Sequence, residues 1–177
     1  PNHLSSPWGL DDIIGLARAG VETMMYPKVR SVGEVLEVQR ILRENGADPD
    51  IIVVVETPQA VACVEDLAAM AKVVGLSFGE GDLSADLGIP IHLPDGTLNP
   101  ALLPPRMRTV LAAAAAEIAC FDFAVMKDIK DSDEVRARAI QFAQMGVTTI
   151  CTIYPPHVEI VNEVLTPTED EVAAARE

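Results

Sequence analysis

Apolar residues form five short runs along the chain, and a segment with helical periodicity follows each run. The run Ile51–Val55 shows no polar alternation, which is typical of a strand covered on both faces and therefore of a parallel sheet. Strands that alternate with helices through right-handed crossovers predict an α/β fold, either a doubly wound sheet or part of a barrel. The expected strands are residues 21–27, 51–55, 74–78, 121–125 and 147–153.

Helix signals lie between these strands. Ser31 is followed by apolar residues at a period near 3.6, so a helix should begin there and end before Asn45-Gly46. The proline-rich segment 89–105 is expected to be a long loop, and long loops in compact domains usually serve function or contact a partner. The other expected helices are residues 13–19, 58–72, 106–119, 134–145, 158–165 and one that begins near 169.

Two carboxylates follow neighbouring strands of this pattern. Glu56 comes directly after the strand 51–55, and Asp82 lies in a Gly-rich turn expected after the strand 74–78. Parallel strands end at the same edge of a sheet, and that edge is where α/β proteins bind ligands. Mg²⁺ takes one or two protein carboxylates and leaves its other positions to water and substrate oxygens. The spacing therefore predicts a metal site.

A structural interpretation of the same residues stays open. Glu56 also suits the start of a helix before Pro58, and Asp82 suits the N-cap of a short helical turn over residues 83–87. Lys28 follows the first expected strand, where it can contact an anionic ligand or remain a solvated loop residue.

Composition and charge narrow the class of protein. At 49% hydrophobic and 23% charged residues the chain is globular, and its uncharged runs are too short to span a membrane. Its 27 acidic and 13 basic side chains give a formal charge of −14, which argues against a nucleic-acid or anionic-membrane surface. The absence of GxGxxG and GxxxxGK[ST] motifs argues against a dinucleotide site or a P-loop.

The cysteines and the one histidine of the long loop carry weak signals. Cys63, Cys120 and Cys151 are an odd number without CxxC spacing, and all three lie in apolar sequence. They are expected to be reduced core residues of a cytoplasmic protein. His92 has no partner at ligand spacing and is expected at the surface.

An acidic cluster follows the strand expected at 121–125. Asp128, Asp131 and Asp133 invite comparison with a Ca²⁺ loop, but the glycine turn and the closing glutamate of an EF-hand are absent. Asp131 or Ser132 as the N-cap of the next helix explains the cluster better.

Five segments in order carry a resemblance to a known family. They are YPKVRSVGEV, VVVETPQAVACVEDLAAMA, LSFGEGDLSADLG, FDFAVMKDIKD and VEIVNEVLTPTEDEVAAARE. Together they resemble the citrate lyase β-subunit and malyl-CoA or citramalyl-CoA lyase family, which is related to the Mg²⁺-dependent class II aldolases. The resemblance covers nearly the whole chain, and the pairing of E-T with G-x-x-D-L-(S/A)-x-D-L-G is its specific part.

The resemblance implies a TIM (β/α)8 barrel, to which this chain would supply about five βα units as strands four to eight. Residues 1–177 would then be a partial barrel domain, with a lead-in loop and helix over 1–20 and the start of a C-terminal helix at 166–177. Family members begin with strands ending in L-D-L-E-D and R-x-N, and only Pro1-Asn2 matches the end of the latter. Three strands, the substrate-binding arginine and a C-terminal lid are therefore expected outside this sequence. Alone, the chain would leave unpaired strand edges, so we expect further segments or other chains to cover them.

The resemblance also assigns site residues. Glu56 and Asp82 match the two metal ligands, for Mg²⁺ or Mn²⁺, while the general base stays unassigned. Tyr154 and Pro155 fall at the expected entrance for coenzyme A, where the family's I-H-P-S-Q is I-Y-P-P-H in this chain. His157 takes the glutamine position of that motif, so the identity of the acyl carrier stays open. The residues expected to bind substrate are Lys28, Glu56, Gly79, Glu80, Gly81 and Asp82.

The implied activity is a metal-dependent carbon–carbon lyase. It would cleave a short 3-hydroxyacyl-CoA, such as citramalyl-CoA or malyl-CoA, to acetyl-CoA and a 2-oxo acid, in a homo-oligomer that is a trimer or a hexamer. Two alternatives stay open. One is a class II aldolase that acts on 4-hydroxy-2-oxo acids without coenzyme A, and the other is an inactive fragment or non-catalytic subunit.

Overall fold

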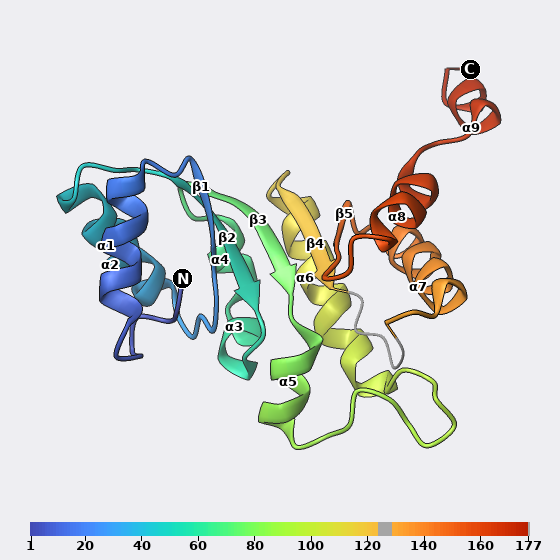
Figure 1. Ribbon diagram of the computed structural model, residues 1–177, viewed down its shortest axis with the longest axis horizontal. Coiled ribbons are helices and arrows are strands. Elements are labelled where there is room, and N and C mark those ends of the chain that lie inside the picture. The colour runs from blue at the N-terminus through green and yellow to red at the C-terminus, as the bar shows by residue number, and fades with distance from the viewer. Residues whose placement is uncertain (124–128, 177) are drawn as a thin grey trace. The chain divides into compact units, whose positions relative to one another are not determined.

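The structure, a computed structural model, describes residues 1–123 and 129–176 of the chain (Figure 1). It divides into two compact units, Pro1–Cys120 and Phe121–Glu177. Both units combine parallel strands with helices, so the α/β class predicted from the sequence is confirmed. None of the described helices combines the length and the apolar character that crossing a membrane requires.

The first unit is built on three parallel strands. The central strand β2 pairs with β1 on one side and with β3 on the other (Figure 1). Helices α1 and α2 pack on each other, while α6 packs against α4 and β3. The elements are α1 (Gly9–Ala19), β1 (Thr23–Tyr26), α2 (Val32–Glu44), β2 (Asp50–Val55), α3 (Pro58–Ala62), α4 (Val64–Ala68), β3 (Val73–Phe78), α5 (Glu80–Leu87), a 3-10 turn η1 (Pro100–Leu102) and α6 (Leu103–Ala115).

Strand β2 is fully buried on one face and partly buried on the other, which agrees in large part with its uninterrupted apolar sequence. Ile51, Val53 and Val55 have no exposed surface, whereas on the opposite face Val54 is 7% exposed and Ile52 is half-buried. Val55 is in register with Phe78, the last residue of β3. The chain therefore leaves both strands at one edge of the sheet, which is the edge predicted to carry the site.

Two helix boundaries match the local signals. The Ser31 hydroxyl accepts a hydrogen bond from the Glu34 N–H and caps α2, as predicted. Gly20 ends α1 with φ of 69°, a left-handed conformation that favours glycine. Helix α1 begins at Gly9, four residues before the predicted start, and Trp8 at its N-cap makes no side-chain cap.

The prediction of a single helix over residues 58–72 is wrong. Two helices of five residues, α3 and α4, replace it and meet at Cys63. Cys63 has φ of −122° and ψ of 25°, and its N–H is shared between the carbonyl oxygens of Gln59 and Ala60. This sharing tightens the last turn of α3 and ends it.

The helix expected over residues 106–119 is shifted toward the N-terminus. Helix α6 begins at Leu103, because the prolines that suggested a loop lie in its first turn, where a missing N–H costs nothing. It ends at Ala115, and Glu117 adopts the left-handed region with φ of 56°. His92, in the loop before α6, is half-buried and forms an isolated bridge with Leu98, so its expected surface position is only partly correct.

Strand β4 (Ala119–Phe123) begins at the end of the first unit, and its residues Phe121–Phe123 pair in parallel with β5 (Thr149–Cys151) in the second unit. Helices α7 (Ser132–Gln144) and α8 (His157–Leu165) pack on each other, and α9 (Glu169–Ala174) follows. Strand β5 is shorter than the predicted 147–153.

Asp131 is the N-cap of α7, as predicted. Its carboxylate accepts hydrogen bonds from the N–H groups of Asp133 and Glu134. This contact accounts for Asp131 as a helix cap, and Asp128 lies outside the described residues.

The three cysteines are free thiols. Cys120 is buried, whereas Cys63 and Cys151 are half-buried because they lie at the ends of a helix and a strand. The expectation of core residues thus holds fully for Cys120 alone. Burial raises the pKa of the Cys63 and Cys151 thiols, so neither is activated as a nucleophile.

A buried ion pair connects α6 to the start of α5. Arg106, 2% exposed, donates to the Glu80 carboxylate at 2.5 Å, and its guanidinium lies 4.7 Å from the centre of the Phe78 ring. Phe78 packs with Leu83 and Leu102. The pair therefore connects the last residue of β3 and the first residue of α5 to the long helix α6.

We predict that Arg106→Met lowers the free energy of unfolding by about 3 kcal/mol or more, because it leaves the Glu80 carboxylate buried without this partner. The double variant Arg106→Met/Glu80→Met should recover at least half of that loss, since it removes both charges. Chemical denaturation measures both values. A double variant that is no more stable than Arg106→Met would contradict the prediction.

Candidate functional site

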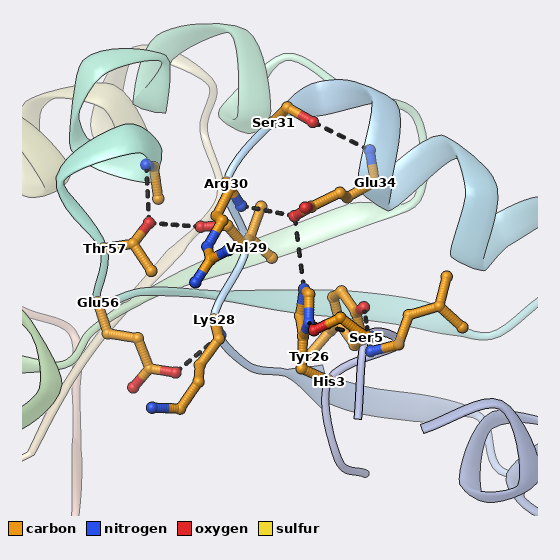
Figure 2. A network of polar contacts seen from close by, with 12 residues as sticks. His3, Ser5, Tyr26, Lys28, Val29, Arg30, Ser31, Glu34, Glu56 and Thr57 are labelled. Carbon is orange, nitrogen blue, oxygen red and sulfur yellow. Dashed lines mark hydrogen bonds and ion pairs between the residues drawn. The ribbon is translucent and has the colours of Figure 1, made fainter. Parts of the chain in front are cut away.

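Glu56 is fixed at the end of β2 by a backbone contact from another strand. Its side chain is 8% exposed, and its Oε1 atom accepts a hydrogen bond of 2.7 Å from the Lys28 N–H (Figure 2). Lys28 follows β1 with φ of 54°, a left-handed conformation that is uncommon for residues other than glycine. The unusual backbone of Lys28 thus aims an N–H group at the buried carboxylate.

Asp82 lies in the first turn of α5 and not in an irregular turn. The predicted Gly-rich turn is wrong here, because Gly79 alone separates β3 from a helix that already begins at Glu80. The Asp82 carboxylate accepts a hydrogen bond of 2.8 Å from the Lys28 ammonium group. Both side chains are about half exposed, at 48% for Asp82 and 51% for Lys28.

Gly79 permits Glu56 to approach β3. A Cβ atom added to Gly79 would lie 2.6 Å from the Glu56 Cβ and 2.8 Å from its Oε2. The Gly79 N–H donates to the Val55 carbonyl oxygen at 3.1 Å, so the backbone cannot move away without losing this bond. Glycine is therefore required here for space, since any side chain would displace the buried carboxylate.

The electrostatics of the site reflect two acids close to each other. Burial raises the pKa of Glu56, the Lys28 N–H opposes the rise, and the charge of Asp82 adds to it. The hydrogen bond to Asp82 raises the pKa of the Lys28 ammonium group. Both effects show a pair of neighbouring carboxylates that a cation stabilises.

These two acids suit a hard divalent cation. Glu56 and Asp82 offer carboxylate oxygens at one strand edge, and Mg²⁺ needs no more than one or two such ligands from a protein. Within the described ranges, residues 1–123 and 129–176, no three His, Cys, Asp or Glu side chains gather into a metal-binding group. The donor set therefore fits an ion that keeps several positions for water and substrate.

The start of α5 offers backbone donors beside the two acids. The Glu80 side chain is turned into the core toward Arg106, so it contributes to this edge only through its backbone. Gly79, the N-cap residue of α5, has no side chain that could cap the helix. The first N–H groups of a helix have no partner inside the helix and favour an anion. Gly81 and Asp82 belong to this first turn, and their expected role in substrate binding stays a prediction.

Thr57 was missed as a residue that positions the site. Its hydroxyl donates to the Val29 carbonyl oxygen at 2.6 Å and accepts from the Ala60 N–H, so it caps α3 and holds the segment after β1 (Figure 2). The signal was present in the sequence, because a threonine before Pro58 has the pattern of an N-cap followed by proline at the first helical position.

A polar network that involves the first residues of the chain was also missed (Figure 2). The His3 ring stacks on the ring of Tyr26, and the Nε2 atom of His3 lies 3.5 Å from the Glu34 carboxylate. The Tyr26 hydroxyl accepts a hydrogen bond from the Leu4 N–H. Burial raises the pKa of Tyr26. The Glu34 carboxylate also accepts the Arg30 N–H at 2.7 Å. These contacts hold the segment between β1 and α2, which carries Lys28, in place.

The residues predicted at the coenzyme A entrance lie in the second unit. Tyr154 is half-buried and packs edge-on against His157, with ring centres 5.0 Å apart. The His157 Nε2 lies 2.8 Å from the Ile129 carbonyl oxygen, and Pro155 is exposed. The role of Tyr154 and Pro155 stays a prediction.

Comparison with known proteins identifies the family of the chain. Residues 1–155 match the model of the HpcH/HpaI aldolase/citrate lyase family. The chain belongs to this family. The resemblance inferred from the E-T and G-x-x-D-L motifs is thus confirmed.

Two curated relatives within the family show how much of a family member the chain represents. A citrate lyase subunit beta-like protein of Mycobacterium tuberculosis is 30% identical over 166 residues, which cover 93% of this chain and 58% of that protein. The citrate lyase subunit beta of Escherichia coli is 27% identical, with coverage of 99% and 59%. The chain therefore spans less than two thirds of the length of these family members.

Solved family structures share the fold. Protein CitE of Mycobacterium tuberculosis, in complex with magnesium, acetoacetate and coenzyme A, matches with a TM-score of 0.84 at 29% identity, over 99% of this chain and 62% of that chain. A citrate lyase structure from Burkholderia xenovorans gives a TM-score of 0.88 at 22% identity, over 97% and 58%, and shows the fold alone.

We predict that Gly79→Ala lowers the free energy of unfolding by about 1–3 kcal/mol, the usual cost of overpacking, because its Cβ would collide with Glu56. Gly81→Ala is the matched control in the same helix turn, where an added Cβ meets nothing within 4 Å. It should leave stability unchanged or slightly raised, since alanine favours helix. Equal destabilisation by both substitutions, measured by thermal and chemical denaturation, would argue against the close approach.

Proposed function

We propose that the protein is a Mg²⁺-dependent carbon–carbon lyase that cleaves a short 3-hydroxyacyl-CoA, of the citramalyl-CoA or malyl-CoA type, to acetyl-CoA and a 2-oxo acid. The observation that carries the proposal is the meeting of Glu56 and Asp82 at the carboxyl ends of β2 and β3. Family membership supports it, because relatives include an L-malyl-CoA/beta-methylmalyl-CoA lyase of Rhodobacter capsulatus at 27% identity.

Glu56 and Asp82 would hold the metal ion. When bound, Mg²⁺ supplies a positive charge that stabilises negative charge on substrate oxygens. The Lys28 N–H orients the Glu56 carboxylate, and Gly79 gives that carboxylate its space. Magnesium in the solved complexes of Mycobacterium tuberculosis CitE supports the choice of ion.

The N–H groups at the start of α5 would hold a substrate carboxylate beside the two acids. Gly81, where an added Cβ would meet nothing within 4 Å, leaves space beside the backbone of this turn, and the helix N-terminus favours an anion. One citrate lyase beta subunit structure from M. tuberculosis contains oxaloacetate with magnesium, a dicarboxylate of the kind this arrangement suits. In this proposal the thioester and its coenzyme A extend away from α5.

The fold proposal follows from the same comparisons. We infer that the five strands are strands four to eight of a TIM barrel, in which Glu56 and Asp82 follow the ends of successive barrel strands. Parallel pairing within each unit and TM-scores of 0.80 to 0.84 with citrate lyase beta subunit and CitE structures at 28–29% identity support this assignment. Active sites of such barrels lie at the carboxyl ends of the strands.

We predict that Glu56→Gln and Asp82→Asn each weaken Mg²⁺ binding by roughly 100-fold or more. Loss of an outer-sphere partner of a metal ligand already costs 10–100-fold, and loss of a ligand charge should cost at least as much. Isothermal titration calorimetry measures the affinity, and circular dichroism checks the fold. Asp66→Asn is the control, because Asp66 is an exposed acid on α4 and does not belong to the first turn of α5, and it should stay within about twofold of the wild type. Unchanged affinity in both Glu56→Gln and Asp82→Asn would remove these residues from the metal site.

The substrate class is tested by assaying the purified protein with Mg²⁺ on racemic citramalyl-CoA and malyl-CoA, and on 4-hydroxy-2-oxo acids in parallel. We expect acetyl-CoA release from at least one thioester and its loss on addition of EDTA. Turnover of the oxo acids alone would favour the aldolase that works without coenzyme A. Metal binding without turnover of either class would favour a non-catalytic subunit.

A further inference from the structure

We propose that the Lys28 ammonium group is a built-in counter-cation of the candidate site, which a divalent metal ion must displace from Asp82. The inference rests on the metal binding proposed above and adds a residue that sets its strength. In the metal-free protein Lys28 balances the two acids, and in the metal-bound protein its ammonium group is released.

Lys28 contacts both acids through different atoms. Its backbone N–H donates to Glu56 Oε1 at 2.7 Å, and its Nζ donates to Asp82 Oδ1 at 2.8 Å (Figure 2 shows Lys28 beside Glu56). The backbone contact does not depend on the side chain, so the ammonium group can leave Asp82 while Glu56 keeps its donor. One residue thus combines a fixed contact with an exchangeable one.

The exposure of the Lys28–Asp82 pair makes exchange possible. Each side chain is about half exposed, and ion pairs of that kind contribute little to stability because water competes for both charges. The ammonium group occupies Asp82 Oδ1, and its positive charge repels a metal ion that approaches the same carboxylate. A metal ion that binds Asp82 through Oδ1 therefore displaces the Lys28 ammonium group.

The charges around the pair explain why a counter-cation is useful. Glu56 is nearly buried beside Asp82, and Asp86 adds a third negative charge that acts on Lys28. In a chain with a net charge of −14, two unscreened carboxylates at this edge would repel each other whenever the metal is absent. The Lys28 ammonium group lowers that repulsion.

The chain contains a matched control for this residue. Lys72 also has a left-handed backbone, with φ of 68°, and its ammonium group pairs with the exposed Asp50 carboxylate at 2.9 Å. Lys72 precedes β3, whereas Lys28 follows β1, so the two lysines lie at opposite ends of parallel strands. Replacing Lys72 removes the same type of ion pair away from the candidate site.

The experiment measures Mg²⁺ affinity by isothermal titration calorimetry for the wild type, Lys28→Met, Lys28→Arg and Lys72→Met. We expect Lys28→Met to bind Mg²⁺ roughly three- to tenfold more tightly, because the competing charge is gone. Lys28→Arg and Lys72→Met should stay within about twofold of the wild type. Lys28→Gln repeats the neutral substitution should Lys28→Met fail to fold.

Thermal denaturation without and with saturating Mg²⁺ gives a second readout. Lys28→Met should melt about 1–4 °C lower than the wild type without metal, and the difference should vanish or reverse with metal, since tighter binding stabilises the folded state. Lys72→Met should show the same difference from the wild type in both conditions.

Two results would overturn the proposal, and they are distinguishable. Unchanged or weaker Mg²⁺ binding in both neutral Lys28 variants, with normal binding by the wild type, would overturn the counter-cation role and leave the proposed function intact. Absence of Mg²⁺ binding by the wild type would overturn the metal site itself, and the counter-cation role with it.

Discussion

The candidate site depends on the close approach of the Glu56 side chain to the backbone of Gly79. This contact brings the end of β2 against the turn between β3 and α5, so that helix α5 begins at once and carries Asp82 to the same edge. A Cβ atom at Gly79 would collide with Glu56, so only glycine fits at this position. The positions of Glu56 and Asp82 therefore depend on this glycine. The parallel register of β2 and β3 brings Gly79 and Glu56 together.

Much of this arrangement could be predicted from the sequence. The apolar run of β2 has the unbroken pattern of a strand buried on both faces, and the acids follow β2 and β3 closely, so a shared edge follows from parallel pairing alone. The Ser31 and Asp131 caps were equally predictable, because an N-cap needs only a short polar side chain at the right place. Sequence patterns predicted these features correctly because the interactions that stabilise them join residues close together in the chain.

The errors arose where local signals allowed two outcomes. The break at Cys63 has no glycine or proline to announce it, and the prolines before Arg106 suit a loop as well as a first helical turn. The contact of Lys28 with both acids was beyond sequence reasoning, because it requires a left-handed backbone at a lysine and the pairing of β1 with β2. Propensity disfavours that backbone, and tertiary contacts override it.

Two ion pairs beside this edge differ in burial, and the difference separates their roles. Arg106 and Glu80 are almost fully buried, so breaking that pair would leave a charge without water, and the pair is suited to holding the start of α5 in place. Lys28 and Asp82 are half exposed, so water can replace either partner at little cost. The same chemistry therefore gives a permanent contact on the inner side of α5 and an exchangeable one on its solvent side. Because the buried ion pair holds the start of α5, the loss of the Lys28 ammonium group leaves Asp82 in position. A site that exchanges one cation for another requires such a fixed acid.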